Sequence, residues 1–512
     1  MAQDIAITGT GGTLRAFRLR TWARVYALLT LLAVALWSAW TLERRFDGLE
    51  IAELDVGATP VTFYSLGNEE ARPLAVVAHG FGGSRQMMDQ ISVTLARTGF
   101  AVAAFDFPGH GRHPGKLSPD ITRIEGTTQQ LVAATLDVVD AMQARADVAG
   151  PVSFVGHSMA TDVVIRAAEA TQNVASVTAI SMYSEAVTPT SPERLLIVSG
   201  AQEGHLRAVG LEAIQQIDAE AGEGQTVIAG NVQRRTVAAP MVGHVGVLYS
   251  AATLDETSRW MAAAAGLTET RALDQTGWVA GALLVAIVLM AWPLAQYLPA
   301  RAGMAPTKVA RRDFLLSCAL PVLPVVLVTY AMPGNLGATS GMVTLVAALA
   351  TWGGVQIAWL VRAGYALPRP EGVATVAVLV WGLAIFGLAL DHYGAAFLPT
   401  GPRIGVMALL MVGTLPLMLA DAMLSAGAPL WRRVVSRVAL IVVLGGAMAL
   451  SPADMGLTFT VLPVMVLFFA VYGSFARWVS ARRGPGTAYF AMGICLAWAI
   501  AASTPIFATA AL

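Results

Sequence analysis

The feature that most constrains the fold of this chain is a series of long apolar segments. One runs from residue 22 to 42, and eight more follow, at about 276–298, 314–332, 339–361, 372–390, 404–425, 436–451, 457–476 and 487–508. A helix of roughly 20 mostly apolar residues crosses the ~30 Å hydrocarbon core of a bilayer. Only 13% of the residues are charged, against about 25% in soluble domains. The sequence therefore predicts a polytopic membrane protein with about nine transmembrane helices.

The basic residues predict the orientation of these helices. Sixteen Lys and Arg residues lie before the first segment or in alternate loops of the C-terminal region, and the opposite loops of that region contain only Arg403. Short cytoplasmic loops carry the excess of Lys and Arg. Trp37 and Trp40 stand where a cleaved signal peptide would need small residues, so we expect an uncleaved anchor. The prediction is a multi-pass protein of the cytoplasmic (inner) membrane. It has a cytoplasmic N-terminus (1–21), an anchor helix (22–42), an extracytoplasmic domain (43–275) and an eight-helix transmembrane domain (276–512).

The charge distribution sets the middle segment apart from the rest. Between Glu43 and Asp274 there are 27 acidic and 16 basic residues, whereas the remainder has 6 acidic and 17 basic residues. An acidic segment joined to a basic, apolar one indicates a water-exposed domain, periplasmic if the cell is Gram-negative, on a membrane body. Neither part has the clustered basic face of a nucleic-acid-binding protein, so no nucleic-acid partner is expected.

Residues 73–262 alternate short apolar runs with helical stretches, a pattern typical of a mostly parallel sheet flanked by helices. The run 152–155 leads into Gly156-His157-Ser158-Met159-Ala160 and then into a helix. A strand, a G-x-S-x-[GA] turn and a helix form a nucleophile elbow, which presents the serine hydroxyl above the sheet. The small residues at 156 and 160 let strand and helix pass closely. We therefore predict Ser158 as the nucleophile.

A second turn places backbone amides near that serine. The run 74–78 ends in the sequence HGFGGS at 79–84, and such a turn after the third strand supplies one donor of an oxyanion hole. We expect the N–H groups of Phe81 and Met159 to form this hole.

With these motifs and DFPGHG at 106–111, the chain resembles the α/β-hydrolase superfamily, as an esterase- or lipase-like serine hydrolase fused to a polytopic membrane domain. The resemblance covers residues 60–265 and implies an acid and then a histidine downstream of Ser158. Four histidines precede the serine, His205 follows directly on a strand, and His392 lies in the membrane part, so His244 remains as the base. Glu203, after strand 195–199, is the predicted acid, and Glu185, after strand 177–182, is the alternative.

These residues predict hydrolysis of an ester or related acyl bond through an acyl-enzyme on Ser158. No metal or organic cofactor is implied, and His110 and His113 are expected to be solvated loop residues. About a dozen residues join strands 177–182 and 195–199, too few for a lid domain, which favours a lipidic or amphipathic acyl substrate that approaches from the membrane. Acyl transfer or peptide cleavage by the same triad remains an alternative. So does a transporter or binding protein with an accessory or inactive hydrolase domain.

The sequence leaves the substrate and the oligomeric state open, together with the role of the bundle. Asp421 lies near the cytoplasmic end of a predicted helix, either as a functional intramembrane carboxylate or as one that reaches the interface. Asp391, His392 and Arg403 lie on the side of the extracytoplasmic domain, either in an ordinary polar loop or in contact with that domain or its substrate.

Overall fold

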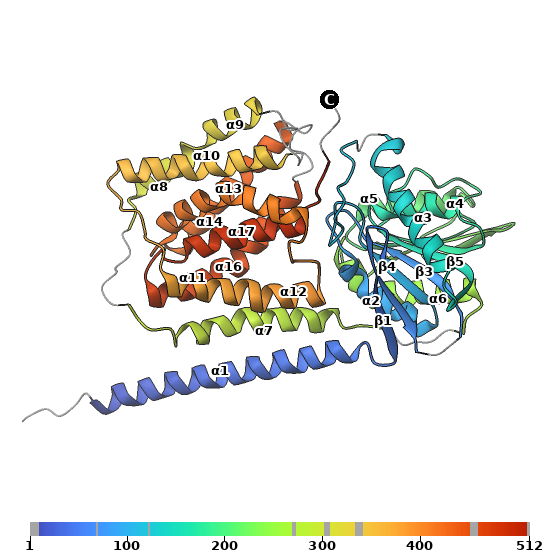
Figure 1. The fold of residues 1–512 in the computed structure, drawn as a ribbon, viewed down its shortest axis with the longest axis horizontal. Coiled ribbons are helices and arrows are strands. Elements are labelled where there is room, and N and C mark those ends of the chain that lie inside the picture. The colour runs from blue at the N-terminus through green and yellow to red at the C-terminus, as the bar shows by residue number, and fades with distance from the viewer. Residues whose placement is uncertain are drawn as a thin grey trace, which may run out of the picture.

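The computed structural model describes residues 10–67, 70–120, 123–268, 273–301, 308–332, 341–450 and 459–508, with side chains from residue 21 onward. The first nine residues of the expected cytoplasmic N-terminus lie outside this described part. An α/β domain and a bundle of helices lie side by side along the long axis of the molecule (Figure 1).

The α/β domain is built on one nine-stranded sheet, in the order β1-β2-β4-β3-β5-β6-β7-β9-β8. The strands are β1 (Leu49–Val56), β2 (Thr59–Leu66), β3 (Arg72–Ala78), β4 (Ala101–Phe105), β5 (Val148–His157), β6 (Val174–Ile180), β7 (Arg194–Gly200), β8 (Thr226–Ala229) and β9 (Val232–Ala239). The six strands from β4 to β9 in this order pair in parallel, and β1, β2 and β8 are antiparallel additions at the edges. The predicted mostly parallel sheet flanked by helices is confirmed.

Sequence analysis did not anticipate the hairpin of β1 and β2. Its turn contains Gly57 at φ +59°, a left-handed conformation that glycine adopts without steric cost. The hairpin continues the sheet beyond β4.

Helices cover both faces of this sheet (Figure 1). Apolar side chains of α3 (Gln129–Gln143), α4 (Ala160–Ala170) and α5 (Gly204–Gln215) join the core on one face. Those of α2 (Asp89–Thr98) and α6 (Ala251–Ala265) join the core on the other. The central strands are buried on both sides, and so they appear in the sequence as continuous apolar runs instead of alternating ones.

The bundle contains α1 (Thr10–Arg44), α7 (Gly277–Ala295), α8 (Arg311–Ala319), α9 (Val322–Ala331), α10 (Met342–Arg362), α11 (Gly372–Leu379), η4 (Val380–Gly387), α12 (Leu388–Tyr393), α13 (Pro402–Ser425), α14 (Leu430–Leu450), α16 (Val461–Arg483) and α17 (Tyr489–Ser503). Within the described residues, eight helical segments are long and apolar enough to cross a membrane, with α8–α9 and α11–α12 each counted as one. This finding supports a multi-pass membrane protein.

The ninth predicted span, 487–508, is shorter than expected. Its helix α17 ends at Ser503 after 15 residues. Pro505 follows, and a proline disfavours the helical conformation of the residue before it and lacks an N–H of its own. The chain beyond Pro505 leaves the bundle, and Phe507 pairs with Leu117 of the α/β domain.

Arg403 joins the bundle to the α/β domain. Its guanidinium is 2% exposed and donates to the carbonyls of Gly109 at 2.8 Å, Gly111 at 3.0 Å, and Ala501 and Thr504 at 2.7 Å each. The first two acceptors belong to the α/β domain and the last two to the end of α17. Arg403 therefore does not lie in an ordinary polar loop, because all four carbonyls from two regions converge on it.

Asp391 makes a second connection between the two regions. One carboxylate oxygen accepts from the amides of Phe397 and Leu398, and the other pairs with Arg112 of the α/β domain. Nearby, the Ser84 hydroxyl accepts from the amide of Ala396 at 2.9 Å. The bundle thus contacts the segment that directly follows the HGFGG turn.

Candidate active site

Ser158 lies on a sharp turn between β5 and α4. Its φ is +53°, a left-handed conformation that costs a non-glycine residue of order 1–3 kcal/mol and is common at functional sites. A Cβ added to Gly156 would lie 2.6 Å from the carbonyl oxygen of Ala160, so this position accepts only glycine. Strand and helix therefore cross closely and project the serine side chain above the carboxyl ends of the parallel strands.

The structure brings together the three side chains predicted to form a triad. Nε2 of His244 is 2.8 Å from the Oγ of Ser158, and its Nδ1 is 2.6 Å from Oε1 of Glu203. The alternative acid Glu185 lines the cavity that contains Ser158 and His244, and its negative charge helps to stabilise the charged form of Arg166. Among the described residues, the carboxylate paired with His244 is that of Glu203.

Hydrogen bonds fix the charge and position of Glu203. Burial raises the pKa of this carboxyl group, but bonds from the Ser181 hydroxyl, the Gly200 amide and His244 outweigh burial and hold the net pKa below its ordinary value. Glu203 is therefore ionised at neutral pH. An ionised acceptor at Nδ1 selects the tautomer of His244 whose Nε2 can accept the proton of Ser158. Sequence analysis missed Ser181, whose only signal was its place after β6.

The HGFGG turn packs directly against the nucleophile. A Cβ on Gly80 would lie 3.0 Å from Cβ of Ser158 and 2.9 Å from Nδ1 of His157. Among the described residues, neither the Phe81 nor the Met159 amide donates to a protein acceptor. Both amides belong to turns that border Ser158, and unpaired amides in such turns can serve an oxyanion.

Buried His79 holds this turn in place. Its Nε2 accepts from the Phe107 amide at 3.2 Å, which leaves Nδ1 to donate to the Gly80 carbonyl at 2.8 Å. Burial lowers the pKa of His79, so the neutral imidazole that these bonds require is favoured. His79 is thus a positioning residue for the turn that carries Phe81.

The expectation that His110 and His113 are solvated is wrong. They are 1% and 8% exposed. The ring of His110 lies against those of His79 and Phe81, and Nε2 of His113 lies 3.4 Å from the Thr59 hydroxyl. His157 is buried as well. Its Nε2 donates to the main-chain carbonyl of His244 at 2.9 Å, and burial, with the nearby His244, lowers the pKa of His157 to about 4. Within the described residues, no group of three His, Cys, Asp or Glu side chains is placed to hold a metal ion.

The site opens into a cavity of about 710 Å³. The wall combines apolar and polar residues. The charged members are Arg123, Asp162, Arg166 and Glu185, and the apolar members are Phe81, Leu117, Ile124, Leu131, Met159, Val163, Leu206 and Phe459. Phe459 belongs to the bundle and stacks on Phe81, with ring centroids 5.8 Å apart. The bundle therefore contributes directly to the wall of the candidate active site.

Residues 69–200 match a protein-family model described as serine aminopeptidase, S33. The match contains the HGFGG turn, the Ser158 elbow and strands β3 to β7. Residues 69–200 are therefore similar to a family of α/β hydrolases. We call the α/β part of this chain the hydrolase domain.

Solved structures similar to the hydrolase domain include a predicted CIB-like hydrolase from Thermoplasma acidophilum (18% identity, 41% of this chain and 94% of that chain, TM-score 0.32). A dienelactone hydrolase from Anabaena variabilis has 17% identity, 42% and 97% coverage and a TM-score of 0.33. A soluble variant of monoglyceride lipase from Saccharomyces cerevisiae has 12% identity, 42% and 95% coverage and a TM-score of 0.30. No curated protein matches the chain.

Proposed function

We propose that this protein is a membrane-integrated serine hydrolase that cleaves an ester or related acyl bond of a lipidic or amphipathic substrate. The observation that carries the proposal is the continuous hydrogen-bonded series from Ser158 through His244 to Glu203, with Ser158 on a strained turn. The cavity has both apolar and charged wall residues, one of the apolar ones from the bundle, and this mixture supports an amphipathic or lipidic substrate.

The proposed reaction has two steps. In the first, Oγ of Ser158 attacks the substrate carbonyl and its proton moves to Nε2 of His244. The oxyanion accepts from the amides of Phe81 and Met159, and the leaving group departs with the proton from His244. In the second, His244 removes a proton from water as the water oxygen attacks the acyl-enzyme. His244 then returns that proton to Oγ of Ser158 as the bond to the acyl group breaks, and the acid is released. Glu203 stabilises the imidazolium in both steps.

We further propose that residues 43–275 form an extracytoplasmic domain between the anchor 22–42 and the transmembrane domain 276–512. The positive-inside rule supports this orientation. The arginines at the ends of α10, α14 and α16 lie at the end of the bundle farthest from the hydrolase domain. The inner membrane is the expected location, with membrane lipids as neighbours and no nucleic-acid partner.

Membranes that contain the full chain should react with a fluorophosphonate probe at Ser158. We expect labelling of the wild type and none of Ser158→Ala, with His244→Ala at least about 10³-fold slower. Ser184→Ala is the matched control, because Ser184 lines the same cavity but bonds to Asp162. A wild type that is correctly folded yet unlabelled would overturn the proposal.

Peptide hydrolysis is a second candidate, favoured by the description of the matching family model as a serine aminopeptidase. The two candidate functions can be distinguished by the substrates that the protein cleaves. A series of p-nitrophenyl acyl esters tests the esterase, and aminoacyl p-nitroanilides test the aminopeptidase. Cleavage of the anilides with the higher kcat/KM would replace the esterase proposal.

A further inference from the structure

A cavity of about 400 Å³ lies at the far end of the bundle from the hydrolase domain. Helix α13 (Pro402–Ser425) begins beside the hydrolase domain, where Arg403 lies, and its 24 residues extend about 36 Å at 1.5 Å per residue. The end of α13, the loop before α14, the end of α16 and the loop before α17 form the wall. This volume lies within the range of small-molecule sites, about 300–1,000 Å³.

The wall of this cavity carries a large excess of positive charge. Five arginines line it, against the single carboxylate of Asp421: Arg301, Arg433, Arg437, Arg477 and Arg482. Both carboxylate oxygens of Asp421 accept hydrogen bonds from the guanidinium of Arg437, at 2.9 Å each. No acidic side chain of the wall is left to balance the remaining arginines.

Three arginines of the wall, Arg301, Arg433 and Arg477, make no side-chain hydrogen bond or ion pair with the described residues, and of these Arg433 and Arg477 interact electrostatically with each other. Within the described residues, neither guanidinium donates a hydrogen bond, and the Nε of Arg433 is fully buried without a partner. Arg477 and Arg437 repel the charge of Arg433. Like charges close together in a partly desolvated wall are unfavourable, and an anion between them would relieve the repulsion.

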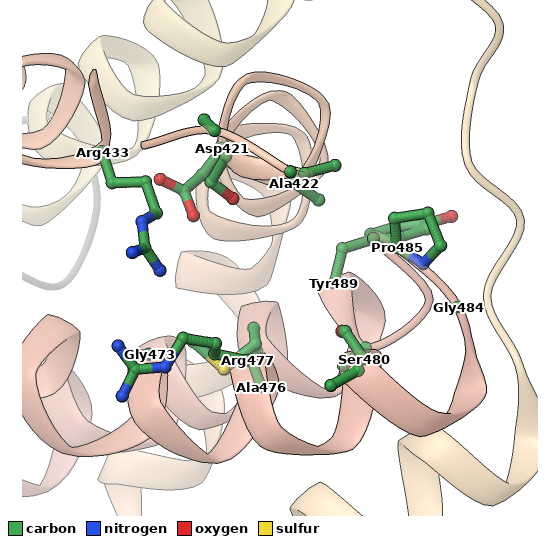
Figure 2. Close-up of a pocket in the computed structure, with 18 of the residues that line it drawn as sticks. Asp421, Ala422, Arg433, Gly473, Ala476, Arg477, Ser480, Gly484, Pro485 and Tyr489 are labelled. Atoms are coloured by element: carbon green, nitrogen blue, oxygen red, sulfur yellow. The ribbon is translucent and has the colours of Figure 1, made fainter. Parts of the chain in front are cut away.

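Other groups that can bind an oxyanion also line the cavity. Figure 2 shows Arg433 and Asp421 on one side of the cavity and Ser480, Pro485 and Tyr489 on the other. The serine and tyrosine provide hydroxyl groups. Tyr489 is also the first residue of the 15-residue helix α17, whose N-terminus carries partial positive charge.

Helix geometry explains part of this arrangement without a ligand. The carbonyl ends of α13 and α16 also border the cavity, and carbonyl ends attract arginine. Arg482 satisfies a carbonyl near the end of another helix, since it donates to the carbonyl of Leu298, three residues beyond α7. Arg433 and Arg477 do not, since they donate to no carbonyl of the described part.

We propose that this cavity binds the phosphate group of an anionic ligand, with Arg433 and Arg477 as its principal ligands. The planar guanidinium pairs with phosphate oxygens through two parallel N–H bonds. The group belongs either to a phospholipid headgroup, since the cavity lies where headgroups meet the bundle, or to a free phosphate. The site is separate from the catalytic centre and does not depend on the proposed hydrolase function.

The test uses the purified full chain in phosphatidylcholine nanodiscs at constant ionic strength. One arm measures binding of radiolabelled inorganic phosphate, and the other adds phosphatidic acid and measures its retention by native mass spectrometry. The double variant Arg433→Gln/Arg477→Gln is compared with Arg362→Gln/Arg369→Gln. The control pair removes two exposed arginines at the same end of the bundle but outside the cavity.

We expect the wild type to bind in at least one arm, which also identifies the source of the phosphate. The cavity variant should bind at least about tenfold more weakly, while the control pair stays within about twofold. Absence of wild-type binding in both arms, or equal weakening in the two double variants, would overturn the proposal. The single variant Arg477→Gln keeps the test valid if the double variant misfolds. The Arg477 side chain is exposed and makes no hydrogen bond with the described residues, so we expect this variant to fold.

Discussion

The hydrolase domain and the bundle place their arginines in different surroundings. In the hydrolase domain, Arg85 pairs with Asp106 and Glu53, and Arg45 pairs with Asp89. In the bundle, Arg437 and Arg483 pair with two of the few carboxylates, Arg403 and Arg432 bond to main-chain carbonyls, and the Arg433 side chain makes no hydrogen bond in the described part. Carboxylates are plentiful in the acidic domain and scarce in the bundle.

This difference shows which interactions hold each region in its folded structure. In the hydrolase domain, paired charges and a buried imidazole hold the turns around Ser158, so the site is fixed within the domain. In the bundle, apolar packing supplies the stability, and a few arginines act at helix ends. One of them, Arg403, connects the bundle to the hydrolase domain through hydrogen bonds to carbonyls of both regions.

The largest expected effect tests whether residues of the hydrolase domain alone hold the catalytic side chains in position. Glu203→Gln should lower kcat for a p-nitrophenyl ester by about 10³–10⁴-fold, because a neutral amide no longer selects the reactive tautomer of His244. Glu185→Gln is the matched control, with the same substitution at a residue that lines the cavity but does not pair with His244, and its expected change is within a few-fold. Equal losses in both variants would break the assignment of the acid.

The next effect tests the connection between the regions. Arg403→Met should destabilise the full chain by about 3 kcal/mol or more, since it leaves buried carbonyls from both regions without a donor. Thermal unfolding in detergent, followed by tryptophan fluorescence, measures this. Arg369→Met, at an exposed position, should change stability by no more than about 0.5 kcal/mol. An unchanged melting temperature for Arg403→Met would show that the two regions are not coupled through this residue.

A smaller effect depends on pH and is confined to the hydrolase domain. The pKa of His157 is about 4 in the folded chain, against 6.5 ordinarily, so the unfolded chain binds the proton more readily. The contribution of His157 is therefore complete above pH 6.5 and lost as the pH falls toward 4, by about 2 kcal/mol at pH 5.

His157→Gln removes this titration. Its melting temperature should fall less between pH 7.5 and pH 5 than that of the wild type, although it starts lower because the bond to the His244 carbonyl changes. Parallel pH profiles of the two proteins would contradict the assignment and leave the other buried histidines as the source of acid sensitivity.

The smallest effect tests whether the bundle shapes the substrate cavity. Phe459→Ala should lower kcat/KM for long-chain p-nitrophenyl esters about tenfold, because it removes apolar contact area, and should leave the acetate ester nearly unchanged. Phe490→Ala, at an exposed position of the bundle, is the control. If the chain-length preference persists in Phe459→Ala, the bundle has no part in selecting the acyl chain.

The sequence alone determined the features that depend on neighbouring residues. Continuous apolar runs predicted the central strands and the membrane helices, because a buried strand or a spanning helix imposes its composition locally. The Gly156-to-Ala160 turn predicted the elbow at Ser158, because the close crossing of strand and helix needs small residues at fixed spacing.

Only the tertiary structure decided what depends on residues far apart in the chain. The meeting of His244 with Glu203 and not Glu185, the hydroxyl of Ser181 on that acid, and the four carbonyls around Arg403 arise from the packing of elements up to hundreds of residues apart. The burial of His110 follows from its packing against His79 and Phe81, and the place of Phe459 beside Phe81 follows from the docking of the bundle. No local pattern encodes such contacts, because each forms only when two separately encoded surfaces meet.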